Sequence, residues 1–170
     1  MTQASRPSRH WAFGLAVFGA LYAMLYALYL RVPDRLLVEQ IYYRAICVPG
    51  AALIDWLMPG AMVHAQANRI VSAHAALEVV RGCDGAGVLF LLVAAILSWR
   101  GRAAHVAAGL LGAVLLVWLL NQARIVALYA TVAGHAGWFT PLHTVVFPTL
   151  FVLLALVFFS AWTAAAAHRG

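Results

Sequence analysis

Residues 88–120 read VLFLLVAAILSWRGRAAHVAAGLLGAVLLVWLL, two apolar runs that are separated only by WRGR at positions 99–102. Apolar runs of this kind are typical of helices inside a bilayer, and a break of this length allows only a tight turn. The stretch therefore predicts two antiparallel membrane helices, over about 85–99 and 103–123, that form a hairpin. The first of them is short at its apolar core.

The composition of the whole chain also predicts a membrane protein. Of its 170 residues, 65% are hydrophobic and 9% are charged, and the mean hydropathy is +0.91. Two further apolar runs, at 11–31 and 143–163, bring the expected number of spans to four. The first run resembles the core of a signal peptide, but it is long enough to span and no small-residue cleavage site follows it. We therefore expect this helix to be retained.

Charge and cysteine content exclude several classes of function. The net charge of +6 comes entirely from arginines, which are scattered between apolar blocks and form no continuous stripe, so nucleic-acid binding is not expected. The two cysteines, Cys47 and Cys83, are too few for a disulfide scaffold and lack the spacing of a zinc site. We therefore expect no metal and no cofactor.

The segment 32–82, between the first two spans, is more polar. Its first half mixes Leu, Ile, Tyr and Trp with charges, a pattern typical of interfacial amphipathic helices, which we expect to break at Pro49–Gly50 and to stop at Pro59–Gly60. Its second half, VHAQANRIVSAHAALEVVRG (63–82), predicts one or two short strands.

The expected fold is thus an all-α integral membrane bundle of about four transmembrane helices, with short β-strands in the segment 32–82. A tail over 1–10 precedes a single membrane-embedded domain over 11–170. Four spans place both termini on the same side of the membrane. The arginines divide almost evenly between the two sides, and the arginine-bearing hairpin at 99–102 favours termini on the inside, because short loops follow the positive-inside rule best.

Three polar residues sit at matching depths on three different helices. With a rise of ~1.5 Å per residue, Cys83 lies about 26 Å and Arg124 about 33 Å from the hairpin, and His143 lies about 38 Å from the end of the last span. If those helix ends share one face, a thiol, a guanidinium and an imidazole reach one layer at the opposite interface.

Each of the three residues also has a plain structural interpretation. An arginine near the end of a span often snorkels, a histidine there is often an interfacial polar group, and a cysteine is often a small buried hydrophobe. Two features favour a shared function instead. Asn121 and Arg124 lie on one helix face, which a snorkelling arginine does not require. Cys83 precedes a helix start, whose positive dipole end stabilises a thiolate.

The glycines around Cys83 suit a nucleophile that a peptide must reach. Gly82, Gly85 and Gly87 carry no side chain and allow another backbone to approach closely. A nearby arginine would favour the thiolate form further.

The ordered motifs resemble those of the exosortase/archaeosortase family, a set of polytopic membrane cysteine transpeptidases and proteases. LEVVRGCDGAG (77–87) leads into a membrane helix, NQARI (121–125) follows, and HTVVFPT (143–149) opens the next helix. The family signature is a Cys-x-Gly at a helix start, a later Asn-x-x-Arg, and a His at the start of the next helix. The resemblance covers about residues 76–150.

The resemblance implies roles for several residues. Cys83 would be the nucleophile, Arg124 would stabilise the oxyanion or orient the peptide, and His143 would protonate the leaving amine. Asn121 would hold Arg124 in place. The chain departs from the family at Asp84, where members often carry Ser or another small polar residue.

Asp84 raises an electrostatic question, because a carboxylate beside a thiol disfavours the thiolate unless the carboxylate is neutralised. Arg81 or Arg124 could pair with it, or Asp84 could cap the start of the following helix. The sequence leaves these alternatives open.

The resemblance also implies a substrate and a location. The substrate would be an exported protein with a C-terminal sorting tail of the PEP-CTERM type, made of a short motif, a membrane helix and a basic end. Its cleavage would pass through a thioacyl enzyme, with water or an amine as the acceptor. The site would face the extracytoplasmic side of the inner membrane, with segment 32–82 outside and tail 1–10 in the cytoplasm. The lipid bilayer and this substrate are the expected partners.

A rival interpretation is a non-enzymatic membrane scaffold or assembly subunit, in which Cys83 is only packing. A different membrane protease is not supported, because the chain has no Gly-x-Ser-x-Gly motif and no paired intramembrane aspartates. Among the histidines, His143 follows Pro141 and opens an apolar run, whereas His135 is flanked by glycines, so we expect His143 to be the catalytic one. Cys47 is expected to be dispensable and not bonded to Cys83.

Overall fold

The computed structural model describes residues 9–73, 75–99 and 101–167, and the described part is mostly helical (78%) with one small sheet. Most of the expected tail 1–10, namely residues 1–8, lies outside the described residues. The elements are α1 (Arg9–Arg31), α2 (Asp34–Leu36), η1 (Leu37–Cys47), α3 (Val48–Leu57), β1 (His64–Gln66), β2 (Arg69–Val71), β3 (Ala76–Glu78), α4 (Ala86–Ser98), α5 (Ala103–Gly134), η2 (Ala136–Trp138), α6 (Phe139–Pro141), η3 (Leu142–Val146) and α7 (Phe147–Ala167).

Three helices in the described part of the chain are long and apolar enough to cross a membrane. They cover Trp11–Arg31, Ala103–Gly134 and Phe139–Ala166, and much of their apolar surface is exposed, as expected for a lipid-facing surface. The predicted second span is the apolar helix α4, which has 13 residues and falls short of that length. The expected number of four spans is therefore not confirmed.

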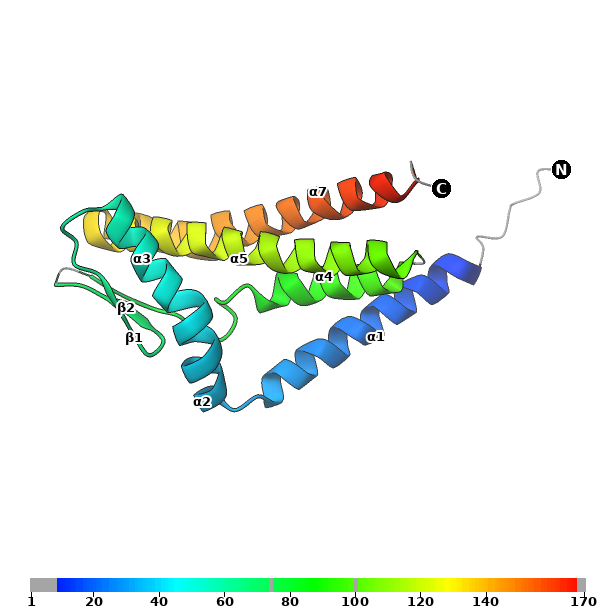
Figure 1. Ribbon diagram of the computed structural model, residues 1–170, viewed down its shortest axis with the longest axis horizontal. Helices are drawn as coiled ribbons and strands as arrows, with labels where there is room; N and C mark the ends of the chain where they lie inside the picture. Colours follow the sequence, from blue (N-terminus) through cyan, green and yellow to red (C-terminus); the bar gives the residue numbers. More distant parts are fainter. Residues whose placement is uncertain (1–8, 74, 100, 168–170) are drawn as a thin grey trace.

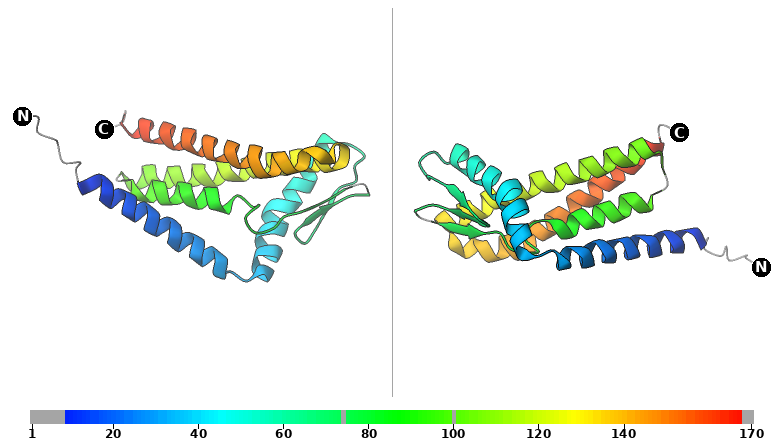
Figure 2. Two further views of the ribbon diagram at one scale, coloured as in Figure 1. Left: turned by 180° about the vertical axis from the view of Figure 1, so that it is seen from behind. Right: turned by 60° about the horizontal axis from the view of Figure 1, so that its bottom comes forward.

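Helices α1, α4, α5 and α7 lie roughly along one axis, the helix from α2 to α3 crosses them at a steep angle at one end, and the sheet lies at that same end. The start of α1, the connection between α4 and α5, and the end of α7 lie together at the other end (Figures 1 and 2). Helix α4 packs against α1, α5 and α7. The depths of Cys83, Arg124 and His143 match only if the hairpin and the end of the last helix lie at the same end of the bundle. This arrangement meets that condition.

Helix α5 and the last helix extend further than the sequence predicts. The span expected over 103–123 continues to Gly134, so Arg124 lies inside a helix rather than at its end. The span expected over 143–163 begins at Phe139, so His143 lies one turn inside a continuous helix. Both residues therefore have helical backbone on either side.

The predicted helix break at Pro49–Gly50 is wrong, because one helix runs from Asp34 to Leu57. Proline lacks an N–H and its ring clashes with the carbonyl four residues earlier, here that of Ala45. The π-helical η1 absorbs this change, and the N–H of Val48 bonds to Tyr43 O, five residues back.

The freed carbonyl of Ala45 is satisfied by the neighbouring helix. Trp118 Nε1 on α5 donates to it at 2.7 Å, and Gln122 Nε2 does so at 3.4 Å. Gly50 permits this close packing, because a Cβ there would lie 3.1 Å from Gln122 Oε1. The predicted stop at Pro59–Gly60 is confirmed, since α3 ends at Leu57.

The second half of the segment 32–82 forms three short antiparallel strands, one more than the upper limit of the prediction. Their order is β1-β2-β3, with Ile70 of β2 opposite Leu77 of β3. Both of these side chains are buried in a core that the sheet shares with η1, α3 and α5. Strand β3 then leads directly to the loop that carries Cys83 (Figure 1).

Candidate active site

The loop that carries Cys83 is shaped by two glycines in left-handed conformations. Gly82 has φ +88° and Gly85 has φ +81°, values that favour glycine. A Cβ at Gly85 would lie 3.0 Å from Val117 Cγ1, so this glycine also lets the loop pack closely on α5. The Cys83 N–H donates to Val80 O at 2.9 Å and closes the turn before α4.

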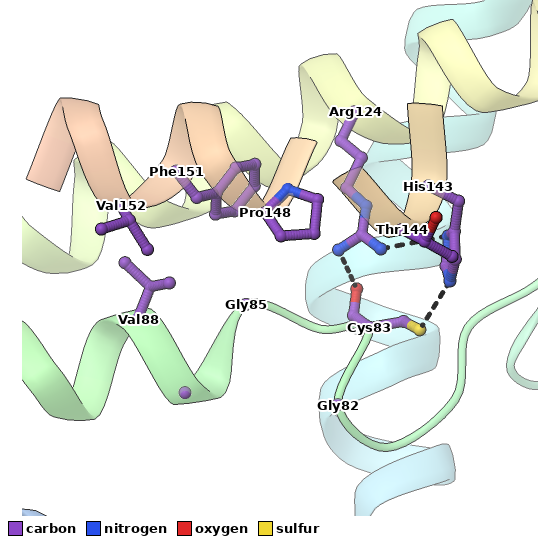
Figure 3. A pocket seen from close by; sticks show the side chains of 11 residues that line it. Gly82, Cys83, Gly85, Val88, Arg124, His143, Thr144, Pro148, Phe151 and Val152 are labelled. Atoms are coloured by element: carbon purple, nitrogen blue, oxygen red, sulfur yellow. Dashed lines mark hydrogen bonds between the residues drawn. The ribbon is translucent and has the colours of Figure 1, made fainter. Parts of the chain in front are cut away.

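Cys83, Arg124 and His143 meet at this loop, as the spacing along the helices predicts. Cys83 Sγ lies 3.4 Å from His143 Nε2 (Figure 3). Arg124 Nη2 lies 3.1 Å from His143 Nδ1, and its Nη1 donates to Cys83 O at 3.3 Å. A single guanidinium thus contacts both the imidazole and the backbone of the cysteine.

A local departure from α-helical geometry positions His143. It lies in the π-helical η3, where the N–H of Phe147 bonds to Leu142 O, five residues back. The π-turn precedes Pro148, as η1 precedes Pro49, and relieves the same clash. The imidazole stacks on Phe139, with ring centroids 5.3 Å apart and an interplanar angle of 10°. Backbone and stacking together restrict the orientation of the ring.

Arg124 is a buried cation without a carboxylate partner. Its exposed fraction is 7%, and none of the three ion pairs formed by the described residues includes it. Its Nε has no hydrogen-bond partner, and the face of Phe151 lies 6.0 Å from its Cζ. Burying an unpaired charge is costly, so an anion is expected beside this guanidinium.

The hydrogen bonds around His143 fix where its proton lies. An arginine only donates, so Nδ1 must accept and the neutral imidazole carries its proton on Nε2. That proton points toward Cys83 Sγ, which must then accept.

Asp84 contacts three donors, and none of them is an arginine. Its Oδ1 accepts the N–H of Ala86 at 3.1 Å, which satisfies one N–H at the start of α4 as the capping alternative predicts. Its Oδ2 accepts hydrogen bonds from the hydroxyls of Tyr29 and Tyr42. The alternatives that pair Asp84 with Arg81 or Arg124 are wrong.

Arg81 instead binds the end of α1. It forms an ion pair of 2.6 Å with Asp34 and donates to the carbonyls of Tyr29 and Val32 at 2.5 and 2.8 Å. These are carbonyls at the C-terminal end of a helix, where a cation is favourable. Arg81 therefore anchors the start of the cysteine loop.

The expected support of Arg124 by Asn121 is not seen. Asn121 is buried, with an exposed fraction of 2%, and its Oδ1 has no hydrogen-bond partner in the described structure. No hydrogen bond joins it to Arg124 among the described residues. Three residues that the sequence analysis did not identify also contact the site. They are Tyr29 and Tyr42, which bind Asp84, and Phe139, which stacks on His143.

An apolar cavity opens beside the three residues, between α4 and α7 (Figure 3). Its volume is about 430 Å³. A Cβ on Gly87 would meet nothing within 4 Å, so this glycine borders open space. The lining consists of Gly82, Cys83, Gly85, Gly87, Val88, Arg124, His143, Thr144, Pro148, Phe151 and Val152.

The other cysteine and the competing histidine lie elsewhere. Cys47 is fully buried in the core beneath the sheet, and burial raises its pKa to about 11. Both cysteines are free, so no disulfide joins them. His135 follows α5 and lines a different cavity with Trp138. Among the histidines in the described part of the chain, His143 is the one with a recorded contact to Cys83.

The described residues contain no group of three or more His, Cys, Asp or Glu side chains that could hold a metal ion. Comparisons with protein-family models, curated proteins and solved structures return no match to this chain. The indications of function are therefore the geometry of the site and the ordered motifs.

Proposed function

We propose that the protein is a membrane cysteine peptidase or transpeptidase of the exosortase/archaeosortase kind, which cleaves the C-terminal sorting tails of exported proteins. The observation that carries the proposal is the buried Arg124, which has no carboxylate partner and donates to His143 and to the backbone of Cys83. A packing role for Cys83 gives no reason to bury an unpaired guanidinium beside it. A thiolate nucleophile does, because it supplies the missing negative charge.

The proposed reaction begins when Cys83 Sγ attacks the carbonyl carbon of the scissile peptide bond. The S–C bond forms, and the carbonyl oxygen becomes an oxyanion, which the guanidinium of Arg124 stabilises. The C–N bond then breaks, and the leaving nitrogen takes the proton from His143 Nε2. His143 Nε2 takes a replacement proton from the incoming acceptor, so the ring stays neutral and no imidazolate accumulates.

The second half of the reaction restores the site. An incoming water or amine loses its proton to His143 Nε2 as it attacks the thioacyl carbon, and the C–S bond breaks to return the Cys83 thiolate. The step thus consumes one acceptor and leaves the proton count of the site unchanged.

The cavity between α4 and α7 supports a substrate that arrives through the bilayer. Its walls are largely apolar, and it borders the three reacting side chains directly. The helix of a sorting tail would lie against this opening and bring its motif to Cys83. In this arrangement the site faces the extracytoplasmic side of the inner membrane, and the segment 32–82 covers it from outside.

The test is co-expression with an exported protein that carries a sorting tail, comparing wild type with Cys83→Ala and Cys83→Ser. Both variants should remain inserted and abundant, because Cys83 is only partly buried, and both should leave the tail uncleaved. In the wild type, a thioester adduct on Cys83 should be trapped by hydroxylamine as a substrate hydroxamate.

Cys47→Ala is the matched control and should retain processing. Full processing by Cys83→Ala would exclude the nucleophile. Loss of protein abundance in both Cys83 variants, without a thioester in the wild type, would support the non-enzymatic scaffold instead.

A further inference from the structure

A second polar cluster lies directly beside the nucleophile and involves residues without a catalytic role. Tyr29 comes from α1 and Tyr42 from η1, and both hydroxyls donate to Asp84 Oδ2, the latter at 3.1 Å. The two hydroxyl oxygens are themselves 3.1 Å apart. Tyr29 and Tyr42, which precede Asp84 by 55 and 42 positions, therefore converge on its carboxylate, directly after Cys83.

Tyr29 is itself fixed by the residue on the other side of Cys83. Arg81 donates to the Tyr29 carbonyl, and its guanidinium lies over the Tyr29 ring, with Cζ 4.9 Å from the centroid. A cation over the ring face withdraws electron density and makes the hydroxyl a better donor. The segment from Arg81 to Asp84 is thus held at both ends by one tyrosine.

This arrangement addresses the electrostatic problem that Asp84 creates. A carboxylate next to a thiolate destabilises it, and no arginine neutralises Asp84. Hydroxyl donors disperse the charge of a carboxylate and direct its lone pairs toward themselves. Asp84 accepts hydrogen bonds from both tyrosines and from the Ala86 N–H, and none of these bonds involves the sulfur of Cys83.

We propose that Tyr29 and Tyr42 are positioning residues that hold the charge of Asp84 away from Cys83 and so preserve its thiolate. The thiolate is that of the proposed function, but the inference concerns the reactivity of Cys83 and needs no substrate for its test.

Tyr42 is suited to remain a donor. Burial, the adjacent Tyr29 hydroxyl and the charge of Asp84 all raise the pKa of Tyr42, so its proton stays in place across the neutral range. The other charged or titratable groups that face Cys83 come from η3, α5, β3 and its own loop. The first three are His143, Arg124 and Glu78, which line one cavity with Cys83. The loop itself carries Arg81 and Asp84, whose side chains bind residues of α1 and η1.

The experiment measures the alkylation of Cys83 by iodoacetamide as a function of pH. The full-length protein is placed in lipid vesicles, and site-resolved mass spectrometry separates Cys83 from the buried Cys47. Tyr29→Phe and Tyr42→Phe should each raise the pH midpoint by about 0.5–1 unit, which slows alkylation at pH values below the midpoint by roughly three- to tenfold. Asp84→Asn should lower the midpoint.

Two comparisons separate this effect from a purely structural one. In the Asp84→Asn background, Tyr42→Phe should no longer change the midpoint, because the charge that the tyrosine holds is gone. Tyr43→Phe, on the same helix as Tyr42 and 38% exposed, should leave the midpoint unchanged. An unchanged midpoint in both single Tyr→Phe variants, or an equal shift with Asn at position 84, would overturn the proposal.

The outcome is distinguishable from failure of the proposed function. A shifted midpoint in a protein that processes no sorting tail would leave the positioning role intact and remove the peptidase. Normal processing with no shift of the midpoint in any variant would leave the peptidase intact and remove the positioning role.

Discussion

Arg124 holds two acceptors with one planar group, the Nδ1 of His143 and the carbonyl of Cys83. An ammonium keeps the charge but cannot reproduce this fork of donors. We therefore expect Arg124→Lys to reduce processing of a tailed substrate by about 100-fold, the size typical of losing an oxyanion donor. The rate of tail cleavage in vesicles measures it.

Arg69→Lys is the matched control for this change. Arg69 forms an exposed ion pair with Glu78 on the sheet, and its replacement should leave cleavage nearly unchanged. If lysine serves as well as arginine at position 124, then Arg124 is a buried anchor and takes no part in the chemistry.

His143 and His135 give the second prediction at this scale. His143 contacts Cys83 and is held by Phe139 and Arg124, whereas His135 lies beside Trp138 in another cavity. His143→Ala should abolish turnover, and His135→Ala should retain most of it. A pre-steady-state assay adds a sharper readout, since a Cys83 thioester that accumulates in His143→Ala would place the histidine in the second step. An active His143→Ala beside an inactive His135→Ala would reverse the assignment.

At the scale of elements, the sequence predicted the helices from their apolar runs but misjudged several ends. The stop at Pro59–Gly60 was predictable, because both residues disfavour a continuing helix. The break at Pro49 was not, because whether a proline ends a helix depends on a π-turn and on a donor that can take up the freed carbonyl. That donor, Trp118, lies 73 residues away from Ala45.

The residues of the site also divide into those that the sequence predicts and those that it does not. Cys83, Arg124 and His143 were predictable, because each lies on or next to an apolar helix whose rise fixes its depth. Tyr29 and Tyr42 were not, because their contact with Asp84 depends on how α1 and η1 turn toward the loop. The sequence shows that these tyrosines carry hydroxyl groups, but it does not show which residue the hydroxyls contact.

The wall that α4 contributes to the cavity gives a prediction for a single element. Gly87 lies in its first turn, and a side chain there would project into open space. Gly87→Leu should therefore fill the cavity without displacing the backbone. It should lower tail cleavage at least tenfold, which is about the effect of losing one apolar contact in a substrate pocket. The alkylation of Cys83 by iodoacetamide should be unchanged.

Gly19→Leu supplies the control for that experiment. Gly19 is also helical, and nothing lies within 4 Å of the Cβ position there. Gly19 does not line the cavity, so cleavage should stay at the wild-type rate. Equal loss of cleavage in both variants would show that the effect arises from general perturbation of the membrane helices.

At the scale of the whole molecule, two hydrophobic cores meet at the site. One lies beneath the sheet and includes Ile125, and the other lies among α4, α5 and α7 and includes Val117. Helix α5 runs through both cores, and Arg124 lies on it between them. The polar trio thus occupies the boundary between the membrane bundle and the covering segment, where neither core encloses it fully.

The 13 residues of α4 have a mechanical consequence for the surrounding lipid. They rise about 20 Å, whereas a hydrocarbon layer is about 30 Å thick. A lipid layer that matched this height beside α4 would be thinner there, and under the proposed function such thinning would let water descend toward the Cys83 thioester. Turnover in vesicles should therefore fall as acyl chains lengthen. A rate independent of chain length would indicate that protein, and not lipid, fills the missing height.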